Sequence, residues 1–161
     1  MLSSEKTGHA EICPMKKIKN PIALVLIVAM VIVSAVVFAG CAGSEPATLE
    51  GYLAGNDEAQ KQIGESLAGL QSDDMRVDVS YEGNKIIITC ALKSTYEGDV
   101  VQAVRDAYVH SEETMKASLE ASIQEIQEST ELSGITIDVV VNNGDGSELW
   151  RGSYGPVDSA D

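Results

Sequence analysis

Histidine and cysteine are both scarce in this chain. Its 161 residues include two histidines and three cysteines, and only His110 and Cys90 lie beyond position 41. One histidine cannot by itself form a histidine-based zinc site or a Ser-His-Asp triad, and no motif supplies the other members. One remaining thiol also excludes a disulfide within that part of the chain. The sequence therefore predicts no enzyme activity and no cofactor.

Basic residues are also few. The chain has 11 lysines and arginines against 25 aspartates and glutamates. Four lysines and two glutamates precede Cys41, so the remainder carries seven basic and 23 acidic residues, a net charge of −16. Such a surface repels nucleic acid, because binding it requires a positive patch. We expect no nucleic-acid partner.

The first 40 residues have the composition of an export signal. Lysines at positions 16, 17 and 19 precede an apolar run over residues 21–39, and positive residues stay on the cytoplasmic side of a membrane. The run ends in Phe38-Ala39-Gly40-Cys41, which resembles the lipobox of bacterial lipoproteins, although an aliphatic residue is usual at the place of Phe38. The resemblance implies that the Cys41 sulfur receives a diacylglyceryl group and that a peptidase cleaves before it.

This interpretation divides the N-terminal part of the chain. Residues 1–40 form the signal peptide, with translation starting either at Met1 or at Met15, and residues 41–47 are the lipidated cysteine and a linker. We expect the protein on the extracytoplasmic face of the cell membrane, held there by its lipid. If uncleaved, the 19-residue apolar run would be about 28 Å long as a helix and would serve instead as a transmembrane anchor.

Residues 48–154 predict an α+β domain of two αββ units, with a flexible tail over 155–161. Thr48 and Asp57 are expected to cap two short helices, and a hairpin then turns at Gly83-Asn84. A long helix, capped at Asp99, runs to about residue 129 and either bends near Ser111 or extends beyond the sheet. A second hairpin follows over residues 135–154. We expect one four-stranded antiparallel sheet with two helices on one face.

The apolar alternation also predicts the register of both hairpins. Tyr81 should face Ile86 in the first hairpin, and Val141 should face Trp150 in the second unless a bulge brings Leu149 there. Cys90 falls on the core side of its strand. A Cys90–His110 nucleophile pair is therefore disfavoured, because a buried thiol is inert.

Short segments around the turns carry a family resemblance. Thr48-Leu49-Glu50, the hairpin around Gly83-Asn84 and the hairpin around Asp145-Gly146 resemble an uncharacterised domain found at the C-terminus of many small Gram-positive lipoproteins. The resemblance implies a lipoprotein in a Gram-positive envelope and implies no activity. The repeated αββ order is also similar, at the level of fold, to small secreted inhibitory domains of the PepSY and β-lactamase-inhibitor kind.

The sheet face opposite the helices is the predicted interaction surface. Its apolar and neutral positions are expected to meet a protein partner in the envelope, through Ile87, Thr89, Ala91, Val140 and Leu149. Residues 142–148 resemble half a calcium loop but lack its ligand order, and Asp78 and Asp138 are weighed as paired catalytic carboxylates. We expect a non-enzymatic interaction module, with a solute-binding accessory lipoprotein or a small envelope enzyme as alternatives.

The lipid anchor yields the first testable prediction. Replacing Cys41→Ala should abolish labelling by a fatty-acid probe and leave an uncleaved precursor, because the diacylglyceryl group requires the Cys41 sulfur. Metabolic labelling and the mass of the membrane-associated product check this. Normal labelling and processing of the variant would contradict the lipobox assignment.

Overall fold

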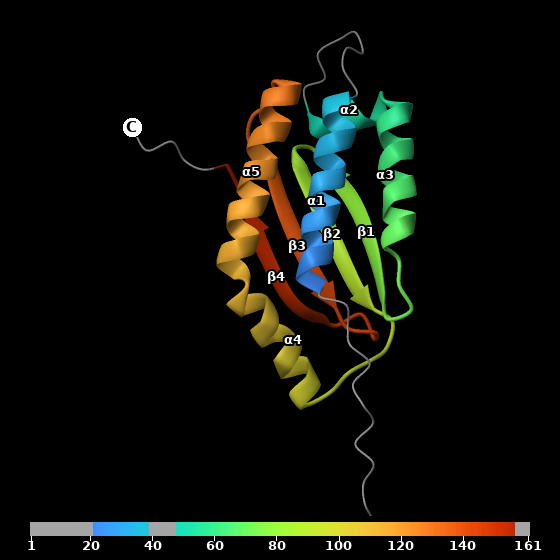
Figure 1. Cartoon of the computed structure of the whole chain (residues 1–161), viewed down its shortest axis with the longest axis vertical. Coiled ribbons are helices and arrows are strands. Elements are labelled where there is room, and N and C mark those ends of the chain that lie inside the picture. Colours follow the sequence, from blue (N-terminus) through green and yellow to red (C-terminus); the bar gives the residue numbers. More distant parts are fainter. Residues whose placement is uncertain (1–20, 39–47, 157–161) are drawn as a thin grey trace, which may run out of the picture.

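The alternating apolar residues of both hairpins form one sheet with the strand order β1-β2-β3-β4 (Figure 1). The computed structural model describes residues 21–38 and 48–156. The strands are β1 (Met75–Glu82), β2 (Lys85–Leu92), β3 (Thr136–Asn142) and β4 (Glu148–Tyr154). The helices are α1 (Pro21–Phe38), α2 (Leu49–Ala54), α3 (Asp57–Leu70), α4 (Asp99–His110) and α5 (Glu112–Thr130). The order helix, strand, strand, helix, strand, strand predicted for residues 48–154 is confirmed.

Both predicted hairpin registers are confirmed. Tyr81 pairs with Ile86 across the Gly83-Asn84 turn, and Val141 pairs with Trp150 across the second turn. A register shift directly after Val141 leaves Leu149 as an extra residue in β4, so Glu148 pairs with Asn142. Turn chemistry and alternation point to the same pairing, so local sequence is sufficient to determine each hairpin.

The prediction of a purely antiparallel sheet is wrong, because β2 and β3 are parallel. The predicted long helix is interrupted at Ser111, between α4 and α5. Of the two expected alternatives, this is the bend near Ser111. The chain returns along the sheet through α5 to the end at which β2 begins, so Thr136 enters β3 beside Lys85. A helix between neighbouring strands gives this parallel arrangement, whereas a tight turn gives the antiparallel one.

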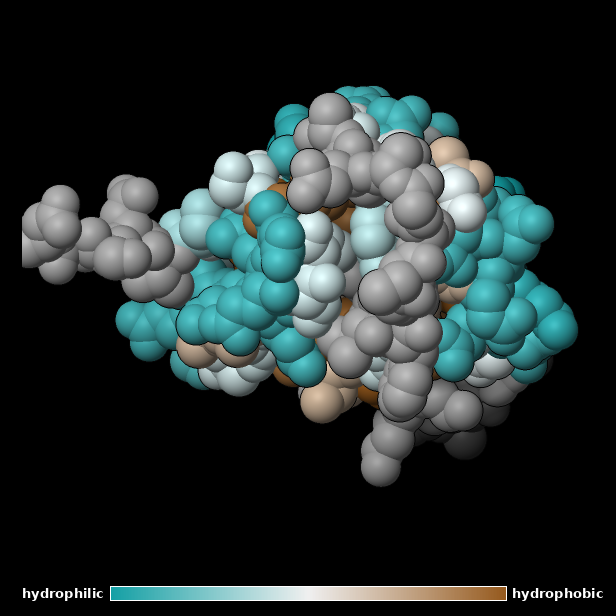
Figure 2. Space-filling model, turned by 90° about the horizontal axis from the view of Figure 1, so that it is seen from above, coloured by the Kyte–Doolittle hydropathy of each residue, from teal (hydrophilic) through white to brown (hydrophobic). Residues whose placement is uncertain are grey.

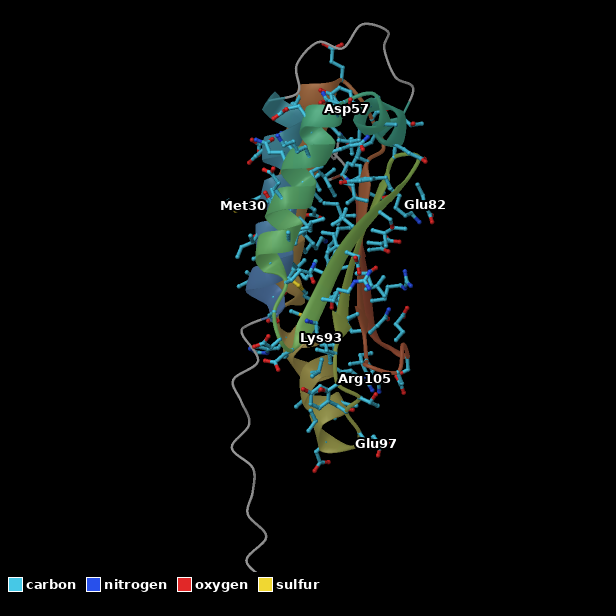
Figure 3. The ribbon with its side chains drawn as sticks, turned by 90° about the vertical axis from the view of Figure 1, so that its right-hand side faces the viewer. Met30, Asp57, Glu82, Lys93, Glu97 and Arg105 are labelled. Carbon is cyan, nitrogen blue, oxygen red and sulfur yellow. The ribbon has the colours of Figure 1, made fainter. Side chains whose placement is uncertain are left out.

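The helices cover one face of the sheet, and α1 lies in that layer between α3 and α5 (Figures 1 and 3). The position of α1 in this layer was not predicted from the sequence. Every third or fourth residue of α1 points inward, and the buried set is Val25, Val28, Ala29, Ile32, Val33 and Ala35. Full burial of each valine or isoleucine contributes about 1.5–3 kcal/mol.

Among the described residues, no helix combines the length and the apolar character that crossing a membrane requires. Cys41, its linker and residues 157–161 of the predicted tail lie outside the described residues.

Aromatic packing at the α4 end of the sheet depends on one glycine. The rings of Tyr108 and Trp150 stack with their centroids 5.0 Å apart. A Cβ atom at Gly152 would come within 2.5 Å of the Trp150 ring and 2.7 Å of the Tyr154 hydroxyl oxygen. Only glycine leaves room for both aromatic side chains on this stretch of β4.

One of the three predicted helix caps is confirmed. The Thr48 hydroxyl accepts from the Gly51 amide at 3.2 Å. Asp57 was expected to cap α3, but Asn56 takes that place and accepts from the Ala59 amide at 3.0 Å. The Asp99 cap is also wrong, because Gly98 precedes α4 with a positive φ of 58° and no side-chain cap.

Two asparagine side chains connect the turns to other parts of the chain. The Asn84 amide accepts from the Leu49 backbone N–H and donates to the Ser133 carbonyl, both at 2.8 Å. The buried Asn143 amide accepts from the Tyr96 N–H and donates to the Tyr96 carbonyl, both at 2.9 Å. Each turn therefore fixes the position of a distant loop or helix start.

We predict that Asn143→Ala lowers the free energy of unfolding by about 2 kcal/mol, because two hydrogen bonds are lost and the Tyr96 backbone groups lose their partner. Asn142→Ala, one residue earlier, should change it by less than about 0.5 kcal/mol. Urea unfolding of the full chain measures both. Equal effects of the two substitutions would show that the Tyr96 contact does not stabilise the fold.

Candidate interaction surface on the open face of the sheet

One face of the sheet points away from the helices (Figure 3). Alternate residues of all four strands line this face. Strand pairing places Asp78, Thr89, Val140 and Arg151 in one row across the four strands. The neighbouring row consists of Ser80, Ile87, Asp138 and Ser153. Most of the predicted interaction residues therefore lie within two adjacent rows.

Asp138 is the polar centre of this face. Its side chain is only 10% exposed, and its Oδ1 accepts from the Ser153 hydroxyl at 2.6 Å. Its Oδ2 lies 3.5 Å from the Lys85 Nζ and 3.9 Å from the Arg151 Nη1. Arg151 also donates to Glu148 at 2.8 Å. A carboxylate this buried requires such partners, since an unpaired charge would be costly to desolvate.

The structure divides the predicted interaction residues into two groups. Thr89 and Val140 are direct neighbours, and Ile87 pairs with Asp138. Ile87, Thr89 and Ala91 are half-buried, whereas Val140 and Leu149 are only 5% and 6% exposed. Leu149 belongs to the hydrophobic core cluster at the bulge. These two positions were expected on the exposed face, and in the structure both are almost inaccessible to solvent.

Val140 and Leu149 therefore add little accessible apolar surface to this face. The large apolar side chains that are exposed among the described residues are Ile27, Met30 and Val109, all on helices. Sequence alternation could identify Asp138 only as an outward polar residue. It could not reveal the ion cluster, because Lys85, Arg151 and Ser153 reach Asp138 only through strand pairing.

Charges of both signs lie on this face of an otherwise acidic domain. Of the seven basic residues beyond Cys41, three project from it, namely Arg76, Lys85 and Arg151. Arg76 pairs with Asp78 at 2.7 Å. Viewed from the α2 end of the molecule, the described surface is mostly hydrophilic (Figure 2). The open face thus combines both signs of charge with half-buried apolar groups.

Cys90 lies in the opposite layer, beneath the helices. It is fully buried, as the alternation predicted, and burial raises the pKa of its thiol from 9.0 to about 12. His110 is exposed near the end of α4. At neutral pH the Cys90 sulfur is protonated and out of contact with solvent, so the arrangement does not provide an activated nucleophile.

The half calcium loop forms the turn of the second hairpin. Asp145 accepts from the Ser147 hydroxyl at 2.6 Å and from the Ser147 amide at 2.9 Å, which lowers the pKa of its carboxyl group. The carboxylates of Asp78 and Asp138 each have separate basic partners. Within residues 21–38 and 48–156, no group of three or more His, Cys, Asp or Glu side chains could hold a metal ion.

A surface pocket of about 370 Å³ lies where α2, α3 and β1 meet. Its lining is mainly apolar and includes Leu53, Ile63 and Leu67, with Glu50 and Gln60 at polar positions. The Tyr81 hydroxyl, from β1, is buried and has no hydrogen-bond partner among the described residues. This pocket was not foreseen from the sequence, because it forms between segments that are distant along the chain.

Residues 49–154 match a family described as a domain of unknown function, DUF4854. The chain belongs to this family. The match covers the domain predicted at residues 48–154 almost completely, and the family assigns it no activity. Among curated proteins and among solved structures, no significant match is found.

Two of the three segments that carried the family resemblance, the start of α2 and the first hairpin, are in contact in the structure of this family member. The Glu50 carboxylate accepts from the Gly83 amide at 2.8 Å, and the Glu50 N–H donates to the Gly83 carbonyl at 2.9 Å. Together with the Asn84 bond to Leu49, these contacts join the start of α2 to the first hairpin. Those matching residues therefore have a structural role, and they do not by themselves mark a binding site.

We predict that the domain loses stability as pH rises from about 9 to about 12. Burial raises the pKa of Cys90 from 9.0 to about 12 and of Tyr81 from 10.0 to about 12. The unfolded chain ionises these groups first, so their contribution is complete below pH 9 and disappears as pH approaches the folded values. Urea unfolding at about pH 8 and about pH 11 measures the loss, and Cys90→Ala should reduce it. An equal loss in that variant would exclude Cys90 as a cause.

Proposed function

We propose that this protein is a lipoprotein of the Gram-positive cell envelope, anchored through Cys41 at the extracytoplasmic face of the membrane. The basic-then-apolar N-terminal segment and the four residues Phe38-Ala39-Gly40-Cys41 support the anchor. The family match supports only the expectation of an uncharacterised domain, over residues 49–154. In this location the acidic domain stands close to the membrane on a linker of a few residues.

The domain acts as a non-enzymatic protein-interaction module, and the open sheet face is its contact surface. The observation that carries this proposal is the Asp138 cluster, in which Lys85 and Arg151 share one nearly buried carboxylate beside half-buried Ile87. A non-obligate protein interface is only about as apolar as the rest of a protein surface, so a modest apolar area is compatible with this role. A protein partner of complementary mixed charge fits this face better than nucleic acid does, since most of the domain surface is acidic.

Solute binding is the second candidate, and the pocket between α2, α3 and β1 favours it. Glu50, Gln60 and Tyr81 supply the polar side-chain groups of its lining, and the Tyr81 hydroxyl has no hydrogen-bond partner among the described residues. In that case the open face would take no part in binding, and substitutions on it would leave function intact.

We predict that Ile87→Lys and Thr89→Lys each weaken partner capture at least tenfold while changing stability by less than about 1 kcal/mol. Both side chains are half-exposed in the free protein, so a lysine can reach water there, whereas an interface would desolvate its charge. Crosslinking pull-down from native membranes, followed by urea unfolding, measures the two effects. Val140 is a poor site for this test because it is 5% exposed.

Ile88→Lys is the matched control, because this neighbour faces the helices and is fully buried. It should unfold the domain, and it should lose capture for that reason alone. Undiminished capture by both Ile87→Lys and Thr89→Lys would eliminate the open face as the contact surface.

A further inference from the structure

The way α1 packs against the domain is the most unusual feature of the helix layer. This helix carries no charged residue over its 18 positions, yet it is not fully enclosed. Val25, Val28 and Ile32 are 1% exposed or less, whereas Met30 is 69% exposed. One side of an apolar helix is thus buried by the rest of the chain, and the other side faces outward.

The surface that receives α1 is built entirely by the domain of residues 48–154. Its walls are α3 and α5, and β2 contacts α1 from below. Buried side chains on these elements join the inward side of α1 in one hydrophobic cluster, and they include Ile63, Ile88, Leu119 and Ile123. Removing residues 1–40 would leave an apolar groove between the two walls.

Side-chain hydrogen bonds hold these walls apart at one end. The Asn84 amide accepts from the Leu49 N–H at the start of α2 and donates to the Ser133 carbonyl, three residues beyond the end of α5. α2 leads directly into α3, where the Gln60 side chain donates to the Leu53 carbonyl at 2.8 Å. The walls are therefore anchored to the same β1-β2 turn, which opposes the closing of the groove.

The dimensions and chemistry of the groove match one helix. Eighteen residues of α1 span about 27 Å at 1.5 Å per residue, and the eight residues of β2 extend about 26 Å. The inward positions of α1 are valine, isoleucine and alanine, with the small Ala29 and Ala35 allowing close approach. An occupant with charge on this side would be desolvated without a partner.

We propose that the space between α3 and α5 is a binding groove for a single uncharged apolar helix. In the uncleaved chain α1 fills it, and after cleavage before Cys41 a helix of the same chemistry, presented by a membrane protein of the envelope, takes its place. The second step rests on the proposed function because it requires removal of α1. The groove lies on the opposite side of the sheet from the Asp138 cluster, so the two surfaces can engage partners independently.

The test uses the full chain carrying Cys41→Ala, which keeps α1 attached whether or not the wild type is processed. A labelled peptide with the sequence of residues 21–38, flanked by lysines for solubility, is the probe in mild detergent. Adding Val28→Lys to the chain should expel its own helix and allow the peptide to bind at one per chain. Adding Met30→Lys, on the exposed side, should leave α1 seated and keep peptide affinity at least tenfold weaker. Hydrogen exchange of β2 amides reports whether the sheet stays folded.

Reciprocal peptides supply the matched control. A peptide with Val28→Lys should lose binding at least tenfold, and one with Met30→Lys should bind like the original. Wild-type protein purified after processing should bind the original peptide as the Val28→Lys chain does. Mass spectrometry of that sample reports separately on lipidation and cleavage, so an unprocessed wild type would contradict the proposed function while the Cys41→Ala arms still decide the groove.

Three results would overturn the proposal. Protected β2 amides without peptide binding in the Val28→Lys chain would show that the walls close. Unfolding of the sheet in that chain would make α1 an obligatory part of the core. Processed protein that still holds its own excised helix, or that does not bind the peptide, would exclude an external helix as the occupant.

Discussion

Burial of one apolar sheet face is the constraint on which the structure depends. Each strand places alternate apolar residues on the same side, and they are stable only if other elements exclude water from them. α5 covers part of this face because it belongs to the connection from β2 to β3. α3 covers another part because it directly precedes β1 in the chain. The remaining strip between them is covered by α1. The most apolar segment of the chain thus occupies the place where the domain's own helices leave a gap.

Asparagine side chains at the turns fix the positions of the segments that lead into and out of the helices. Asn84 holds the start of α2 and the segment after α5, while Asn143 holds the loop that precedes α4. Each amide uses both its donor and its acceptor on backbone groups, so replacement by an apolar residue leaves two backbone groups without their partner. These contacts explain why turn residues can carry the family resemblance in a domain with no recognisable catalytic set.

The two faces of the sheet differ in the way their polar groups are satisfied. On the helix side, the hydroxyl groups of Tyr81, Tyr108 and Tyr154 are buried without hydrogen-bond partners among the described residues. On the open side, Asp138 is almost as buried but is surrounded by Lys85, Arg151 and Ser153. A charged group cannot be buried without such compensation, whereas a tyrosine hydroxyl costs far less to leave unpaired. The open face consequently combines a fixed charge arrangement with accessible neighbours such as Ile87.

The sequence alone determined what depends on neighbouring residues: the two hairpins, their registers and the inward position of Cys90. For the long helix it left a bend near Ser111 or an extension beyond the sheet as alternatives, and the structure shows the interruption at Ser111. It did not determine the parallel pairing of β2 with β3, because that depends on the direction in which a whole helix returns along the sheet. Nor did alternation predict that Val140 and Leu149 would be almost inaccessible, since exposure depends on neighbours contributed by other strands and by a bulge. The position of α1 was beyond sequence reasoning for the same reason. Uniform hydrophobicity shows that a helix must avoid water, but only the gap between α3 and α5 decides which of its sides is buried and against what.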